Sequence, residues 1–307
     1  MKRYNLLSMP RKNAIAYMEV VFAVIVWGGS FIATKIALSE ISPVAVVWTR
    51  FAVGVIILGI AVALRHQFSF PNRRELAYFT LLGFLGITFH QWLQSTGLVT
   101  AQASTTAWIV STTPIYMAIF SWLFLHEKLN WLQMSGIALA VIGVLLVVSK
   151  GDIRGLIGEK YASSGDFLIM ISAPNWAVFS ILSRSGLKRH QATQMMFFVM
   201  AIGWLFTSIL FLNGPGFREI GYLTWKGWLG LGFLGVFCSG LAYIAWYDAL
   251  KVVPASQVGA FLYIEPLVAV IVAWFILGEP LLISSLIGGA IILIGVWVVQ
   301  RTKKSYS

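Results

Sequence analysis

The sequence predicts an all-α polytopic membrane protein with ten transmembrane helices, arranged as two inverted five-helix repeats. Of the 307 residues, 59% are hydrophobic and only 11% are charged, whereas soluble domains carry about 25% charged residues. Ten apolar segments can be marked, each roughly the 20 residues that a helix needs to cross a hydrocarbon core of about 30 Å. The second half of the chain also repeats the first, which predicts the doubled architecture.

The ten segments are joined by short connections, which predicts tightly packed antiparallel neighbours. They run near residues 14–38, 43–64, 75–98, 103–125, 131–149, 164–184, 192–212, 225–250, 255–277 and 281–300. The longest connection, residues 150–163, is predicted to be an extracytoplasmic linker. It separates a first repeat in residues 1–149 from a second in residues 164–307.

The repeat is clearest between the fourth and ninth segments, where a shift of 152 residues superposes Pro114 on Pro266. Earlier in the chain the shift is 149, which superposes Trp27 on Trp176, and three extra residues in the eighth segment explain the change. Because five is an odd number, the two halves must cross the membrane in opposite directions. Inverted repeats of this kind place a substrate site near the midplane and suit alternating access.

The charge distribution predicts the topology. With the N-terminus in the cytoplasm, 15 of the 22 Lys and Arg residues fall on the cytoplasmic side, as the positive-inside rule requires. The net charge of +11 is therefore a topology signal, and no nucleic-acid partner is expected. The one cysteine, Cys238, excludes a disulfide within the chain and a cysteine-based metal site. We expect a multi-pass protein of the cell (plasma or inner) membrane with both termini in the cytoplasm.

Several stretches together resemble a known family. They are WGGSFIATKIAL (27–38), PVAVVWTRFAVG (43–54), the proline-bearing fourth and ninth segments, and the two closing segments with paired glycines. These resemble the drug/metabolite transporter superfamily, and within it the EamA-type ten-helix permeases. The resemblance covers nearly the whole chain and implies a secondary carrier of small organic metabolites, commonly an exporter of amino acids or amines. It does not specify the solute.

Polar and aromatic residues in the middle of the spans are the candidates for a substrate-binding cavity, because lipid would leave their polar atoms unsatisfied. These candidates are Trp27, His90, Trp108, Ser111, Thr112, Asn175, Trp176, Ser239, Tyr243, Tyr263 and Glu265. In the fourth span the polar residues share one helix face. That face predicts either a cavity wall or a helix contact, since Ser and Thr also serve in helix packing.

Glu265 and His90 are the candidates for ion coupling. A carboxyl group in mid-span is costly and by default functional, so Glu265 is predicted to carry a proton or to pair with an ammonium group. A protonated carboxyl that is hydrogen bonded inside the bundle is the alternative. His90 can relay protons near neutral pH, although a structural donor is the commoner role of a lone histidine. The first repeat has Thr113 where the second has Glu265, so a charge-based mechanism would be asymmetric.

The basic residues within or at the ends of spans allow two interpretations. Lys35 and Arg184 occupy equivalent places in the two halves and could attract a carboxylate at the two mouths, or extend to lipid headgroups. Arg50 lies deeper, where an unpaired guanidinium is costly, and the sequence does not place a partner such as Glu19 or Glu40.

The equivalent residues Glu127 and Glu279 end the fourth and ninth spans. We predict that they tie these spans to the fifth and tenth helices. Glycines seven residues apart in the fifth and tenth spans permit close helix approach, as at a dimer contact. They are Gly136, Gly143, Gly288 and Gly295.

The sequence therefore predicts a transporter whose partners are a small organic solute, the lipid bilayer and, if it is coupled, protons, with a homo-oligomer as a further option. An importer or facilitator of another metabolite is the first alternative, and a non-transporting membrane scaffold or sensor the second. An intramembrane enzyme is disfavoured, since no HExxH, Gly-x-Ser-x-Gly or carboxylate cluster is present. We expect no catalytic residue, no metal and no cofactor, and the sequence lacks a phosphate-binding loop for ATP.

Overall fold

A computed structural model of the chain describes residues 11–125, 129–152, 163–253 and 255–303, and its regular structure there is entirely helical. The first half contains α1 (Arg11–Leu38), α2 (Pro43–Leu64), α3 (Arg73–Gly83), α4 (His90–Thr100), α5 (Ala103–Val110), α6 (Thr113–Leu125) and α7 (Trp131–Val148). The second half contains α8 (Ser164–Leu187), α9 (Ala192–Leu212), α10 (Gly216–Ile220), α11 (Trp225–Gly232), α12 (Ala242–Val252), α13 (Ala255–Val258), α14 (Glu265–Leu277) and α15 (Ile283–Lys303). The predicted fold class is confirmed.

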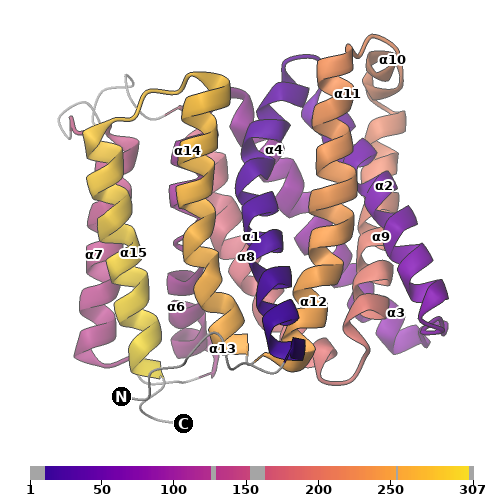
Figure 1. Cartoon of the computed structure of the whole chain (residues 1–307), viewed down its shortest axis with the longest axis horizontal. Coiled ribbons are helices and arrows are strands. Elements are labelled where there is room, and N and C mark those ends of the chain that lie inside the picture. The colour runs from indigo at the N-terminus through magenta and orange to yellow at the C-terminus, as the bar shows by residue number, and fades with distance from the viewer. Residues whose placement is uncertain (1–10, 126–128, 153–162, 254, 304–307) are drawn as a thin grey trace.

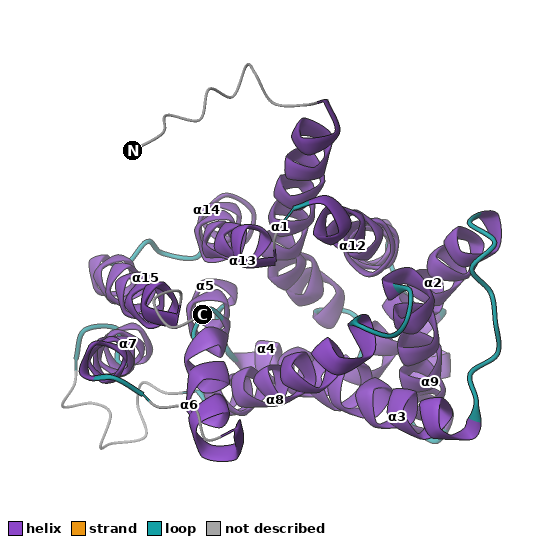
Figure 2. Ribbon diagram, turned by 90° about the horizontal axis from the view of Figure 1, so that it is seen from below, coloured by secondary structure: helices purple, strands orange, loops and turns teal. Residues whose placement is uncertain are grey.

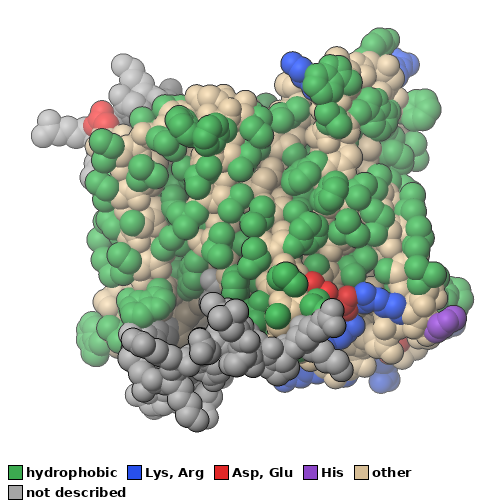
Figure 3. Space-filling model, in the orientation of Figure 1, with side chains coloured by type: hydrophobic (Ala, Val, Ile, Leu, Met, Phe, Trp, Pro, Cys, Tyr) green, Lys and Arg blue, Asp and Glu red, His purple; other side chains and the backbone are tan. Residues whose placement is uncertain are grey.

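Nine helices in the described part of the chain are long and apolar enough to cross a membrane, and the shorter apolar helix Phe261–Leu277 lies at the ninth predicted span. Apolar side chains cover most of the face that Figure 3 shows, and the charged side chains on it gather toward its upper and lower ends. Ile56 in the middle of α2 is 61% exposed, and Ile209 in the last turn of α9 is 58% exposed. Such a surface would aggregate in water, and it fits a bilayer.

The helix starts follow local rules. The side chains of Asn72, Asn130 and Ser163 each accept a hydrogen bond from a backbone N–H in the first turn of α3, α7 and α8. In each helix the side chain of the third residue accepts a hydrogen bond from the backbone N–H of the capping residue. These capping boxes satisfy donors that no helical carbonyl can reach. They fix where each span enters the membrane.

The two halves run in opposite directions. α1 begins and α15 ends at the same end of the molecule, here called the terminal end, and α10 lies at the far end (Figure 1). Helices pack mainly across the halves: α1 with α12, α4 with α8, α2 with α9, and α7 with α15. Exchanging the halves turns the first pair into the second and leaves the other two pairs unchanged, so the chain has a pseudo-two-fold axis. Viewed along the helices, α7 and α15 form a pair at one side of the bundle (Figure 2).

The third and eighth spans each contain a π-helical segment at equivalent places, Phe84–Phe89 and Phe233–Leu241. The first has six residues and the second has nine. The three extra residues that shift the sequence repeat therefore lie in the second π-helical segment. π-Helical turns leave backbone groups open to other partners and occur often at functional sites.

The fourth and ninth spans are interrupted before their prolines. In the fourth span Pro114 lacks the N–H that would bond the Val110 carbonyl, and the Thr113 hydroxyl donates to that carbonyl instead, at 2.7 Å. In the ninth span a 3-10 segment, Gly259–Ile264, precedes Glu265 and Pro266. Broken spans at membrane depth are tolerated where protein or a cavity satisfies the backbone.

The glycines of the fifth and tenth spans contact each other within one chain. A Cβ on Gly143 would stand 2.6 Å from the Gly288 carbonyl oxygen, and one on Gly136 would stand 2.7 Å from that of Gly295. The close approach predicted for these residues therefore joins α7 to α15, and the glycine faces are not free to form a dimer contact.

Different contacts join the halves at the two ends. At the terminal end, Arg65 after α2 makes two hydrogen bonds to the Asp248 carboxylate of α12, at 2.9 and 2.5 Å. At the far end, the Thr224 hydroxyl and backbone N–H donate to Glu40, at 2.6 and 2.7 Å. These bonds, the hydroxyl's first, lower the pKa of the Glu40 carboxyl from its ordinary value.

Candidate solute-binding site

Trp27, Ser239 and Tyr243 come together where α1 meets the eighth span. The Trp27 indole N–H donates to the carbonyl of Cys238, at 3.1 Å, and so satisfies a backbone group of the longer π-helical segment. The Trp27 ring lies 5.6 Å from that of Tyr243 and 5.2 Å from that of Trp246, measured between centroids. An aromatic wall therefore lines the contact between the two halves.

The symmetry-related contact, where α8 meets the third span, brings together His90, Asn175 and Trp176. The Asn175 amide donates to the carbonyl of Leu85, at 2.9 Å, which supports the shorter π-helical segment as Trp27 supports the longer one. The His90 ring lies 4.6 Å from the Trp176 ring, and its Nδ1 is buried without a hydrogen-bond partner among the described residues. His90 directly follows the shorter π-helical segment, whereas Ser239 lies within the longer one.

Arg50 lies between these two groups. Its Nε donates to the Ser239 hydroxyl, at 3.1 Å, and its Nη1 to the Gln91 side-chain oxygen, at 3.2 Å. The residue is only 6% exposed. Neither Glu19 nor Glu40, the acidic partners that the sequence suggested, bonds to Arg50, and Glu40 binds Thr224 instead.

Glu265 begins α14 at the interruption of the ninth span, next to α1. A Cβ on Gly28 would stand 2.8 Å from the Glu265 carbonyl oxygen, so the small residue lets the two helices touch there. The Glu265 side chain is only partly buried, and within the described residues it makes no hydrogen bond or ion pair. Its carboxyl group stays available to a proton or to a cationic group of a solute.

Trp108 and Tyr263 lie in a different place, where the fourth and ninth spans pack on α15. Trp108 is 1% exposed and its ring covers Gly289, with no room for a Cβ there. The Tyr263 hydroxyl donates to Gln300, at 2.7 Å. Both residues belong to an apolar cluster with Ile115, whereas Trp27, Trp176 and Tyr243 share another cluster.

The hydroxyls of the fourth span donate to their own helix. Ser111 donates to the Trp108 carbonyl, at 2.7 Å, and Thr112 to the Ile109 carbonyl, at 2.6 Å. Their protons are used to satisfy the interrupted backbone, while their oxygen lone pairs stay available as acceptors. The structure thus gives these two residues a role in shaping the break beside the predicted site.

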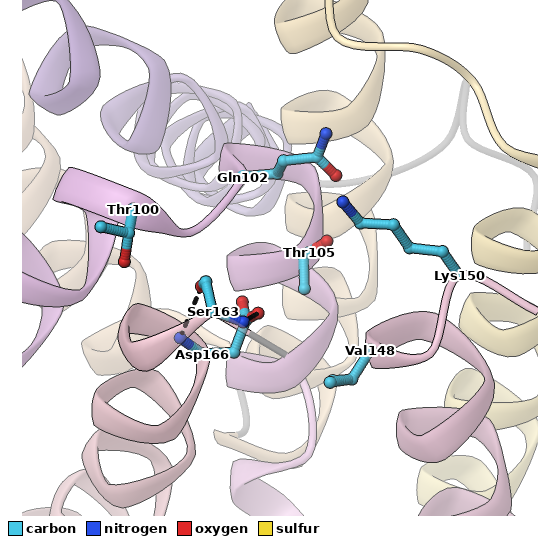
Figure 4. Close-up of a pocket in the computed structure, with 7 residues that line it drawn as sticks. All are labelled: Thr100, Gln102, Thr105, Val148, Lys150, Ser163 and Asp166. Atoms are coloured by element: carbon cyan, nitrogen blue, oxygen red, sulfur yellow. Dashed lines mark hydrogen bonds between the residues drawn. The ribbon is translucent and has the colours of Figure 1, made fainter. Parts of the chain in front are cut away.

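A small polar pocket lies at the far end, between the fourth span and the start of α8. Figure 4 shows Asp166 hydrogen bonded to Ser163 below Thr105, with the Lys150 amine extended toward Gln102. The pocket holds about 30 Å³, and Asp166 Oδ1 is buried beside it without a partner among the described residues. This volume suits one water molecule and is too small for an organic solute.

Comparison with known proteins identifies the family. The sequence model of the EamA-like transporter family matches the chain twice, at residues 14–149 and 163–301. The chain belongs to the EamA-like transporter family. The resemblance stated from the motifs is thereby confirmed.

Two relatives of this EamA-like transporter align with it over nearly the whole of both chains. A protein of Archaeoglobus fulgidus named an uncharacterized transporter is 27% identical, covering 93% of this chain and 97% of that protein. A probable terminal-alkyne amino-acid exporter of Streptantibioticus cattleyicolor is 24% identical, covering 94% of this chain and 95% of that protein. A protein of known crystal structure shares the fold with a TM-score of 0.64 at 17% identity, over 94% of this chain and 98% of that chain.

In this EamA-like transporter Glu279 contacts the fourth span. Its carboxylate accepts hydrogen bonds from the backbone N–H groups of Ala103 and Ser104, at 2.8 and 3.1 Å, and from the Ser104 hydroxyl, at 2.6 Å. The acid therefore caps the N-terminus of α5, where the helix dipole favours a negative charge, rather than tying its span to the tenth helix. The equivalent Glu127 lies outside the described residues.

Glu279→Ala is expected to lower the free energy of unfolding by about 1–3 kcal/mol, because it leaves the buried N–H of Ala103 and the partly buried N–H of Ser104 without their acceptor. Ser104→Ala removes one of the three bonds and should cost less. Thermal unfolding of the detergent-solubilised protein, followed by tryptophan fluorescence, measures both effects. Equal losses in the two variants would show that the carboxylate does not act as the cap of α5.

The two predicted mouth cations of the transporter have different surroundings. Lys35 donates to the Ala101 carbonyl, at 2.5 Å, at the end of α4. Arg184 instead lines an open depression of about 520 Å³ at the terminal end, together with Lys188, Tyr247 and Lys251. The equivalent positions are therefore used differently in the two halves.

Sequence reasoning missed Gln91 and Trp246 and passed over the backbone of Cys238. Gln91 follows His90 directly and is 8% exposed, so a polar residue in mid-span was the available signal. Trp246 lies seven residues after Ser239, two helical turns further on. The Cys238 carbonyl could not be found from the sequence, because it is exposed to a partner only by the π-helical geometry.

Proposed function

We propose that this EamA-like transporter is a secondary carrier that exports small organic solutes, such as amino acids or amines, by alternating access. The observation that carries the proposal is the group of polar and aromatic mid-span residues between two inverted halves. Arg50 lies between two groups of these residues. One group is Trp27, Ser239 and Tyr243, and the other is His90 and Trp176. The name of the S. cattleyicolor relative supports the amino-acid class.

The proposed solute path runs between the terminal end, which we place in the cytoplasm, and the far end. Alternating access requires contacts between the halves that break on one side while those on the other side form. Arg65–Asp248 is the candidate at the terminal end, and Glu40–Thr224 and the Glu279 cap are the candidates at the far end. Each joins one half to the other, so each must open when its side opens.

The remaining predicted residues have supporting roles in this proposal. Ser111 and Thr112 present acceptor oxygens at the break of the fourth span, and Trp108 and Tyr263 hold α15 against the two broken spans. Asn175 positions the shorter π-helical segment. Glu265 and His90 are the groups proposed to exchange protons during transport.

Flux through purified protein in proteoliposomes tests the proposal. Labelled amino acids and their decarboxylated amines are loaded, and efflux is followed with and without a pH gradient against empty vesicles. We expect saturable efflux of a subset of the panel, accelerated by an inward proton gradient. If no member of a broad panel moves faster than in empty vesicles, the carrier function is wrong.

A further inference from the structure

We propose that Arg50 binds the carboxylate of the transported solute, so that a carboxylate is the group this carrier selects. The inference rests on the proposed function and narrows it from amino acids or amines to solutes that bear a carboxylate. It comes from the burial of Arg50, from its neutral partners and from the residues around it.

The charge of Arg50 is buried without a counter-charge. The residue lies seven positions after Pro43, which is about 10 Å along α2 from its start, and it is 6% exposed. The hydrogen-bond partners of its guanidinium are the neutral Ser239 and Gln91, and the described residues offer it no carboxylate within ion-pair distance. A buried guanidinium of this kind is costly, and an anionic solute would supply the missing charge.

The guanidinium is held in one orientation before any solute arrives. Ser239 fixes Nε from the eighth span and Gln91 fixes Nη1 from α4, so the bonds come from both halves. Nη2 makes no hydrogen bond among the described residues. A planar fork held in this way can bind a carboxylate through parallel N–H bonds, which a lysine cannot reproduce.

The surroundings of Arg50 fit the rest of a small organic acid. Tyr243 lies one helical turn beyond Ser239, and the Trp27 ring packs on it. A solute with a carboxylate on Arg50 would therefore have an aromatic wall beside it.

Competition in the wild-type carrier tests the carboxylate requirement without any mutation. The best-transported labelled L-amino acid is challenged with the unlabelled amino acid, its amide and its decarboxylated amine. Loss of a hydrogen-bonded charge contact should weaken the amide and the amine as competitors by roughly ten- to a hundredfold. If the amine is transported as well as its parent acid, the Arg50 assignment is overturned while the carrier function stands.

Variants separate binding from a structural role. Arg50→Lys keeps the charge and loses the fork, so it should raise KM by roughly tenfold or more with a smaller change in kcat. Arg50→Gln should abolish the preference for the acid over its amide. The matched control is Arg189→Gln, since the Arg189 guanidinium bonds to Ser185 near the end of α8. It should leave both the KM and the preference for the acid unchanged. A lower unfolding temperature in Arg50→Lys with an unaltered KM would show a structural role only.

Discussion

Glu265→Gln is expected to abolish proton-driven flux while the protein is produced and inserted normally. The carboxyl group begins α14 directly after the 3-10 segment, and its side chain is only partly buried. The helix N-terminus stabilises the ionised form, whereas the low dielectric of the membrane interior stabilises the protonated form. Glutamine has nearly the same size and cannot release a proton. Efflux from proteoliposomes at several external pH values measures the effect.

The matched control is Glu75→Gln, outside the apolar core of the third span. Glutamine still completes the capping box of α3, so this variant loses a carboxylate without losing a helix cap. We expect it to keep the wild-type dependence on pH. Solute exchange without a gradient should persist in Glu265→Gln, since that mode needs no net proton transfer. A pH dependence in Glu265→Gln equal to that of the wild type would remove Glu265 from the coupling mechanism.

Gly83→Ala and Gly232→Ala are expected to have opposite effects, although both glycines begin a GFLG motif. A Cβ on Gly83 would stand 2.6 Å from the Val199 carbonyl oxygen and 2.9 Å from the Gly203 backbone nitrogen. Neither backbone atom can move away alone, so overpacking should cost about 1–3 kcal/mol. A Cβ on Gly232 would meet nothing within 4 Å, and alanine there should stabilise the helix by up to about 1 kcal/mol.

Apparent unfolding temperatures of the two variants and the wild type, measured in one detergent, compare these effects directly. Each variant serves as the control for the other, because both replace the first glycine of a GFLG motif with alanine. A similar loss in both variants would mean that Gly232 also packs against a neighbouring backbone.

Local patterns were sufficient to predict the spans, while contacts between distant helices were not predictable. Hydrophobic length located α2 and α9 within a few residues, and the odd number of spans per half predicted the inversion. The fourth-span stripe shows the limit. Its period placed Ser104, Trp108 and Ser111 on neighbouring turns, but only the structure shows that Glu279 binds the first and that Gly289 receives the second.

The candidate site was predicted in part for the same reason. Polarity in mid-span pointed to Trp27, His90 and Ser239, which do lie where the halves meet. Arg50 was recognised as costly, yet its partners could not be identified, because a helix period gives the direction of a side chain and not the residue opposite. The three extra residues in the eighth span were the one sequence feature that indicated the longer π-helical segment.

The unequal π-helical segments have a consequence for the resting carrier. If the two halves were identical, exchanging their conformations would give inward- and outward-facing states of equal free energy. The nine-residue segment that contains Ser239 and the six-residue segment that precedes His90 remove that equality. A difference of about 1.4 kcal/mol between the two states suffices for a tenfold population bias. The three inserted residues are thus one of the differences between the halves through which the sequence can favour one of the two states.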